Sequence, residues 1–80
     1  MTTRTFRLSV DRAEGALERV LGVVRRRRLG LERLSVDPSA DGKWDIAIRA
    51  AASEMETGLA LRQFTALIDV RAVRVEDATG

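Results

Sequence analysis

Four consecutive arginines, Arg25, Arg26, Arg27 and Arg28, form the densest cluster of charge in the chain. Guanidinium groups bind carboxylates and phosphates, so this run is a candidate contact for an acidic partner, a phosphate or a nucleic acid. The run also suits the last turn of a helix, where cations complement the negative end of the helix dipole and their heads extend into water. We prefer the solvated helix end to a partner contact, and a nucleic acid is the least favoured ligand.

A second candidate site lies at an expected strand-to-helix junction. Its residues are Asp11, Arg12, Ala13, Glu14, Gly15 and Ala16. Free amides at a helix start bind anions, so the carboxylate of an amino-acid effector could sit there. However, Asp11 and Glu14 have capping-box spacing, in which each side chain satisfies a free amide, and they would occupy or repel that position, although Arg12 offers a compensating charge. A self-capped helix is the preferred interpretation, and an effector site is the alternative.

The residue types that are missing exclude most catalytic chemistry. The chain has no cysteine, histidine or tyrosine, which rules out disulfides, thiolate metal sites, an imidazole base and a phenolic acid. Asp37, Asp41 and Asp45 are evenly spaced, but they span a turn and lack the full calcium-loop pattern, so we assign them to turn geometry and solubility. We therefore expect no catalytic residue, no metal site and no cofactor in this chain.

Length and charge indicate a single small domain. The 80 residues carry a formal net charge of +2, and the pI of about 10.4 exaggerates this small excess because few groups titrate between the carboxylates and the lysine. A domain of this size buries only about 60% of its unfolded surface, so pairing with another chain is expected. The stretch Met1–Thr5 lacks an apolar signal region and no apolar run is long enough to span a membrane, which predicts a cytoplasmic protein.

The hydrophobic period switches six times along the chain. The pattern predicts a strand over residues 6–10, a helix from Arg12 to between Arg25 and Arg28, a strand over 31–36, a turn over 37–42, a strand over 43–50, a helix opened by Ser53 and Glu56, and a strand over 70–75. This order is α+β, the ferredoxin-like βαββαβ arrangement, with a four-stranded antiparallel sheet and two helices on one face. We expect the domain to cover residues 5–75 and residues 76–80 to form a disordered tail.

The pattern also predicts the core. The apolar stripes of the two helices are Leu17, Val20, Leu21 and Val24, and Ala60, Leu61, Phe64, Leu67 and Ile68. Leu31 and Leu34 are three apart, so either a bulge separates them or Leu31 belongs to the helix exit. Trp44 is expected to cover the core, with an interface anchor as the alternative. Arg7, Arg33 and Arg49 are expected on the helix-free face of the sheet, which resembles an RNA platform in topology but lacks the stacking aromatics such platforms need.

Three segments carry a resemblance to a known family. They are Glu14–Arg25 (EGALERVLGVVR), Leu34–Val36 (LSV) and Leu67–Val70 (LIDV). Together they resemble an ACT domain and, more narrowly, the short single-domain small (regulatory) subunit of acetolactate synthase, also called acetohydroxyacid synthase. The chain departs from the family at the turn, where Arg12 takes the place of an Asn, and at the end of the first helix, where Arg27-Arg28 replaces Arg-Gly. A left-handed stop at Arg28 would be strained, so we expect this helix exit to differ.

The resemblance implies a non-catalytic, cytoplasmic subunit of branched-chain amino acid biosynthesis. Such small subunits form homodimers and bind and activate a large subunit that carries thiamine diphosphate, flavin and magnesium. The family's effector site lies at the junction of the first strand and first helix, which by position corresponds to residues 11–16 of this chain. The effector that the resemblance implies is a branched-chain amino acid. The alternatives are a free-standing amino-acid-sensing ACT dimer and, less favoured, a nucleic-acid-binding ferredoxin-like module.

Overall fold

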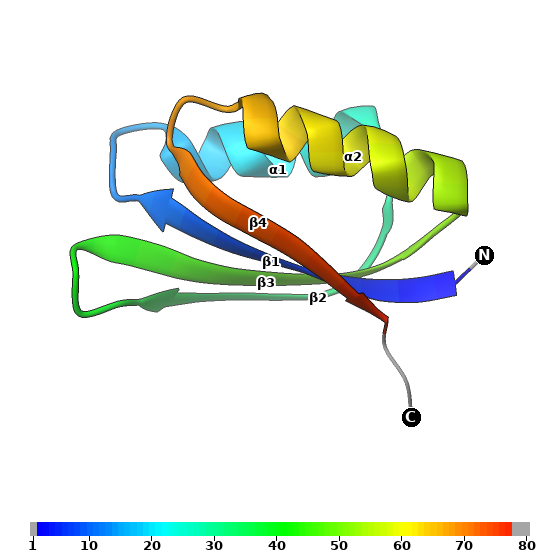
Figure 1. The fold of residues 1–80 in the computed structure, drawn as a ribbon, viewed down its shortest axis with the longest axis horizontal. Coiled ribbons are helices and arrows are strands. Elements are labelled where there is room, and N and C mark those ends of the chain that lie inside the picture. Colours follow the sequence, from blue (N-terminus) through cyan, green and yellow to red (C-terminus); the bar gives the residue numbers. More distant parts are fainter. Residues whose placement is uncertain (1, 78–80) are drawn as a thin grey trace.

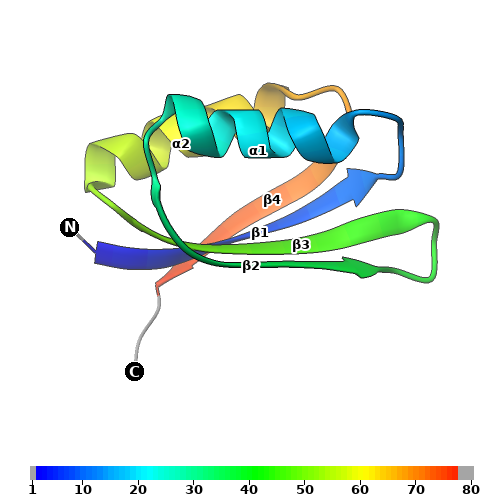
Figure 2. The same cartoon turned by 180° about the vertical axis from the view of Figure 1, so that it is seen from behind.

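The computed structural model describes residues 2–77 and contains six elements in the predicted order. They are β1 (Thr2–Asp11), α1 (Ala16–Arg26), β2 (Gly30–Pro38), β3 (Lys43–Ala52), α2 (Glu54–Ala66) and β4 (Val70–Asp77). The sheet has the strand order β2-β3-β1-β4, and all neighbouring strands are antiparallel. Both helices cover the same face of the sheet, as Figures 1 and 2 show from opposite sides. The predicted ferredoxin-like βαββαβ fold is confirmed.

The sheet is longer than the sequence pattern indicated. β1 begins at Thr2 and β4 continues to Asp77, so Glu76 and Asp77 are part of a strand, although we expected them in the tail. The added residues pair with β1, and a salt bridge of 3.0 Å joins Arg4 to Asp77. Cross-strand charge pairs of this kind stabilise the extended conformation. The sequence pattern did not predict this part of the strand, because the residues are polar and show no hydrophobic alternation. The remaining tail, residues 78–80, lies outside the described residues.

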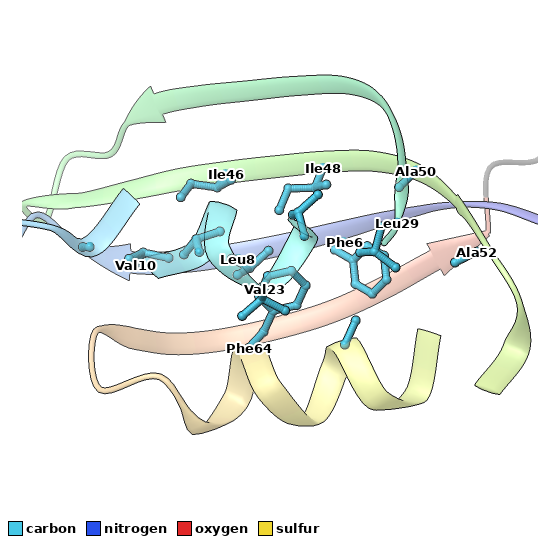
Figure 3. Close-up of a cluster of buried hydrophobic side chains, with 14 residues drawn as sticks. Phe6, Leu8, Val10, Val23, Leu29, Ile46, Ile48, Ala50, Ala52 and Phe64 are labelled. Atoms are coloured by element: carbon cyan, nitrogen blue, oxygen red, sulfur yellow. The ribbon is translucent and has the colours of Figure 1, made fainter. Parts of the chain in front are cut away.

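The core lies between the sheet and the two helices (Figure 3). Alternate residues of the central strands point into it, and Phe6 lies opposite Ile48 on one side and Val75 on the other. The rings of Phe6 and Phe64 are both fully buried, with centroids 5.5 Å apart and a tilted geometry. This aromatic pair connects the middle of β1 to α2 and holds the helix on the sheet.

The buried stripe of α1 differs partly from the prediction. Val20 and Val24 are buried as predicted, but Val23 and Ala16 are buried as well, whereas Leu17 and Leu21 are only half-buried; the buried residues of the helix are Ala16, Val20, Val23 and Val24. The reason is that α1 packs against α2 as well as against the sheet. Its buried face is therefore rotated about the helix axis relative to the predicted stripe, which assumed contact with the sheet alone.

The predicted cap and most of the predicted buried stripe of α2 are present, but the stripe ends with the helix. Ser53 caps α2 as predicted, and its side chain accepts a hydrogen bond from the Glu56 amide at 3.1 Å. Ala60 and Phe64 are buried as predicted, but Ile68 is 80% exposed, so its assignment to the core was wrong. The helix ends at Ala66, and Ile68 lies beyond it in the loop to β4, where the 3.6-residue period no longer fixes the direction of a side chain.

The start of β2 contains the bulge proposed from the spacing of its leucines. The register between β2 and β3 shifts between Leu31 and Arg33, and Leu31 is 47% exposed within the strand. The bulge adds one residue to β2 between Leu31 and Leu34, which accounts for their odd spacing of three. Beyond the bulge the strand alternates regularly, and Leu34 and Val36 face the core. The bulge interpretation is confirmed, and Leu31 belongs to β2 rather than to the helix exit.

Candidate functional site

The turn between β1 and α1 is not self-capped. Gly15 is the N-cap residue of α1, with a left-handed φ of +78°, and no side chain bonds to the free amides of the first turn. The helix starts at Ala16 rather than at Arg12, because the Ala13 amide donates to the Asp11 carbonyl (2.8 Å) and forms a tight turn first. The predicted capping box of Asp11 and Glu14 is therefore wrong, since both residues precede the helix.

The carboxylate of Asp11 is bound by an arginine from the other end of the chain. The Nε of Arg71 donates to Oδ2 of Asp11 at 2.7 Å, and Nη2 of Arg71 donates to the same oxygen. These hydrogen bonds lower the pKa of Asp11 and raise the pKa of Arg71. Asp11 is thus ionised, and the positive charge of Arg71 balances its negative charge. The carboxylate of Asp11 therefore does not oppose an anion at the start of α1.

A second ion pair lies beneath Gly15. The Nε of Arg19 donates to Oδ2 of Asp69 at 2.8 Å, and its Nη2 donates to that oxygen and to the Glu14 carbonyl (3.0 Å). Asp69 is 8% exposed, and the guanidinium of Arg19 supplies hydrogen bonds to this largely buried carboxylate. The pair joins α1 to the loop before β4. We did not single out either residue from the sequence, because they are 50 positions apart and no local spacing connects them.

Arg12 points away from the helix start and toward the β2–β3 hairpin. Its Nε donates to the Lys43 carbonyl (3.1 Å) and its Nη2 to the Ser39 carbonyl (2.9 Å). The guanidinium lies 4.8 Å from the centre of the Trp44 ring, in cation–π geometry. The turn, the hairpin and the α2–β4 loop therefore meet at one end of the molecule, as Figure 1 shows.

The six residues of the predicted effector site have different roles. Asp11 and Gly15 lie with the Arg19–Asp69 pair at the start of α1, whereas Arg12 binds the hairpin. Ala16 is buried in the core, and the side chains of Ala13 and Glu14 are exposed. The arrangement offers uncapped, positively polarised amides beside a neutralised carboxylate, which can bind a single carboxylate group.

The aromatic side chains all lie on the side of the sheet that faces the helices. Phe6 and Phe64 are fully buried, and Trp44 is half-buried and packs against the core beneath Arg12. Trp44 thus covers the core, as predicted. Because these three residues are all the aromatics of the chain, the helix-free face has no ring on which a base could stack.

The arginine run forms the exit of α1, with a geometry that we did not expect. Arg28 is left-handed, with φ 52°, its amide donates to the Arg25 carbonyl (3.1 Å), and the Leu29 amide donates to the Val24 carbonyl (3.1 Å). These two bonds define a Schellman motif, with Leu29 and Val24 in the accompanying buried positions. The expectation that the helix would avoid a left-handed Arg28 is wrong, because both hydrogen bonds and the burial of Leu29 offset the strain.

The side chains of the run are available for contacts. Arg25, Arg26 and Arg28 are exposed and Arg27 is half-buried, and none of the four forms an ion pair within residues 2–77. A hollow of about 500 Å³ lies beside them, lined by Arg26, Arg27, Arg28, Leu29, Ala51, Ala52, Ser53 and Glu56. The C-terminal end of α1, whose residues line this basic hollow, lies opposite the β1–α1 turn (Figure 2).

Within residues 2–77, no group of three or more His, Cys, Asp or Glu side chains is arranged to hold a metal ion. The helices over the same residues are too short and too polar to cross a membrane.

Comparison with solved structures shows where this fold recurs. The small subunit of acetolactate synthase from Thermotoga maritima superposes with a TM-score of 0.85 at 18% identity, over 98% of this chain and 49% of that one. The ACT domain of GTP pyrophosphokinase from Chlorobium tepidum gives 0.81 at 10% identity, over 94% and 97%. A formyltetrahydrofolate deformylase from Burkholderia mallei gives 0.77 at 19% identity, over 94% and 28%. At these identities the likeness concerns the fold.

Comparison of the sequence is more specific. A search of curated proteins finds no match to this chain. A family model described as ACT domain matches residues 12–73, which include both helices, the hairpin and most of the sheet. The chain therefore belongs to the ACT domain family.

Proposed function

We propose that this ACT domain is the regulatory small subunit of an acetolactate synthase, and that it binds and activates the catalytic large subunit in branched-chain amino acid biosynthesis. The observation that carries the proposal is the sequence pattern over Glu14–Arg25 and Leu67–Val70, combined with the match to the ACT domain family over residues 12–73. The fold of the Thermotoga maritima small subunit supports the proposal, because 98% of this chain superposes on 49% of that subunit.

In this proposal the chain acts as a cytoplasmic homodimer and takes no part in the chemistry. Activation arises because the small subunit binds the competent conformation of the large subunit more tightly than the idle one, and the gain is limited by that difference in affinity. The basic hollow beside Arg26, Arg27 and Arg28 is the proposed contact with an acidic surface of the large subunit.

The test is reconstitution with the catalytic large subunit of an acetolactate synthase from the same organism. We expect mixing to raise turnover and the double variant R26E/R28E to weaken binding, with a smaller salt dependence than the parent protein. R62E is the control for charge reversal outside the hollow and is compared with the single variants R26E and R28E, because Arg62 is an exposed arginine on α2. If turnover stays at the value of the large subunit alone over a saturating range of this chain, the proposal is wrong.

A free-standing amino-acid sensor is the second candidate function, and the uncapped start of α1 favours it. In this proposal the carboxylate of a branched-chain amino acid binds the first-turn amides after Gly15, where no side chain competes and Asp11 is already neutralised by Arg71. A ligand at about 100 times its dissociation constant adds about 2.7 kcal/mol to the free energy of unfolding.

Thermal unfolding with valine, leucine and isoleucine tests this site. We expect at least one of them to raise the melting temperature, and valinamide, which lacks the carboxylate, to have no effect. Equal shifts with valine and valinamide would show that the helix start does not bind the ligand. Sensing without any synthase partner would separate this function from the first. The nucleic-acid module is not proposed, because the helix-free face has no aromatic ring.

A further inference from the structure

The face of the sheet opposite the helices, here called the open face, carries an ordered pattern of charge. Three rows of its side chains cross the strands in the order β2, β3, β1, β4. The first row is Asp37, Asp45, Ser9 and Ala72; the second is Ser35, Ala47, Arg7 and Arg74; the third is Arg33, Arg49, Thr5 and Glu76. Figures 1 and 2 show that no other element of residues 2–77 covers this face.

Like charges lie directly opposite one another at three places in these rows. The register pairs Asp37 with Asp45 on β2 and β3. The other two pairs are both basic, Arg33 with Arg49 and Arg7 with Arg74. Like charges in directly opposed positions destabilise a sheet, so this pattern costs the isolated chain free energy.

Ion pairs within the chain relieve only part of this repulsion. Glu76 bonds to Arg7 at 2.7 Å and lies 3.4 Å from the Nε of Arg74, and these contacts lower the pKa of Glu76. Asp37 and Asp45 form no ion pair within residues 2–77. Among the described residues, Asp37 and Asp45 therefore form an acidic pair without an ion-pair partner at one corner of the open face.

The open face has a central hollow with charged side chains at its border. A hollow of about 430 Å³ lies at its centre, where the side chains are small: Ser9, Ser35, Ala47 and Ala72. Arg7 and Arg74 border the hollow on one side, and Asp37 and Asp45 border it on the other. The hollow can thus receive long side chains, and a cationic side chain that reaches its acidic border meets Asp37 and Asp45.

We propose that the open face binds the open face of a second copy of this chain. The two sheets would stack about a two-fold axis that runs parallel to the strands, between β3 and β1. Such an axis keeps each row opposite itself and places β2 over β4 and β3 over β1. Every contact occurs twice, which is the property of an isologous interface.

This symmetry matches large side chains with small ones and opposite charges with each other. Arg7 of the second copy lies over Ala47, and Arg74 of the second copy lies over Ser35, so both arginines fill the central hollow. In the third row, Arg33 of one copy lies over Glu76 of the other.

The acidic pair gains its missing counter-charge in the same arrangement. Asp45 is two residues along β3 from Ala47, so it lies beside the incoming Arg7, and Asp37 lies beside the incoming Arg74 in the same way. A two-fold axis across the strands would place each strand over its own copy, so Arg7 and Arg74 on β1 and β4 would not meet the aspartates of β3 and β2.

Charge balance favours a second copy over a polyanion. Together with Glu32, which lies 3.5 Å from Arg49, these three rows carry four arginines and four carboxylates and are neutral overall. A nucleic acid or an acidic membrane surface requires an excess of positive charge. The proposed interface goes beyond the regulatory function above and does not depend on it, and it leaves the strand edges of β2 and β4 free for other contacts.

A charge swap tests the interface by sedimentation equilibrium in low salt. R7D and D45R should each raise the dissociation constant of the face-to-face step by about tenfold or more, a change that corresponds to at least about 1.4 kcal/mol. The double variant R7D/D45R restores opposite charges in both copies and should recover most of the association. R62D, the same charge change on the helix layer, should leave it unchanged.

Folding is checked separately by circular dichroism. D45R places an opposite charge across from Asp37 and so should not unfold the chain, which keeps the test informative even if R7D is unstable. The proposal is overturned if wild-type protein shows no association step that D45R weakens, or if the double variant associates as weakly as the single ones. Loss of binding to the synthase large subunit with self-association unchanged would also overturn it and would assign the face to that subunit.

Discussion

Replacing Gly15 by alanine tests whether the β1–α1 turn has the structure described. Gly15 has φ +78°, a conformation that costs a residue with a Cβ about 1–2 kcal/mol. A Cβ built there lies 2.8 Å from Nη1 of Arg19, which must then move. Arg19 is not free to do so at no cost, because it holds the buried carboxylate of Asp69.

The backbone strain and the displaced Arg19 side chain both lower the free energy of unfolding of G15A. The backbone accounts for about 1–2 kcal/mol, and a weakened charge-assisted hydrogen bond to a mostly buried carboxylate adds about 1 kcal/mol. The second value is at the low end because the Arg19 side chain is 43% exposed and screened by water. We therefore expect G15A to unfold about 2–3 kcal/mol more easily than the parent protein.

Urea unfolding measures this difference, and G22A is the matched control. Gly22 is inside α1 with ordinary helical geometry, and an added Cβ meets only the mobile end of Arg26, at 3.2 Å. The same substitution should therefore stabilise the protein there, by about 0.5–1 kcal/mol. In an R19M background, G15A should lose its side-chain contribution and keep its backbone contribution. A G15A protein as stable as the parent would refute the turn geometry.

Three further outcomes follow from the core, the exit of α1 and the exposed ion pairs. F64A removes a fully buried ring that packs on Phe6 and should cost about 3–5 kcal/mol in chemical unfolding. R28G should stabilise the protein by up to about 1 kcal/mol in the same assay, because glycine adopts φ 52° without strain; a loss would contradict the Schellman exit. Asp11 and Glu76 have a lowered pKa in the folded state, so their contribution to stability is complete above their ordinary values of 3.8 and 4.5 and is lost as the pH falls through the lowered ones. Urea midpoints should therefore fall on acidification, and less so in D11N.

The sequence alone determined the order of the elements and most of their inward faces. Strands of period two and helices of period 3.6 are local patterns, and the Ser53 cap acts within one turn of chain, so neither needs knowledge of distant residues. The spacing of Leu31 and Leu34 predicted the β2 bulge for the same reason.

The tertiary structure decided which groups meet at the candidate sites. Asp11 and Glu14 have the spacing of a capping box, yet Asp11 binds Arg71, which is 60 positions away and reaches it because β4 lies beside β1. Gly15 starts α1 over the Arg19–Asp69 pair, and the charge rows of the open face exist only once strand order and register are known. The direction of a side chain follows from its own backbone, whereas the energy of a charge depends on its neighbours in space, and packing alone selects those neighbours.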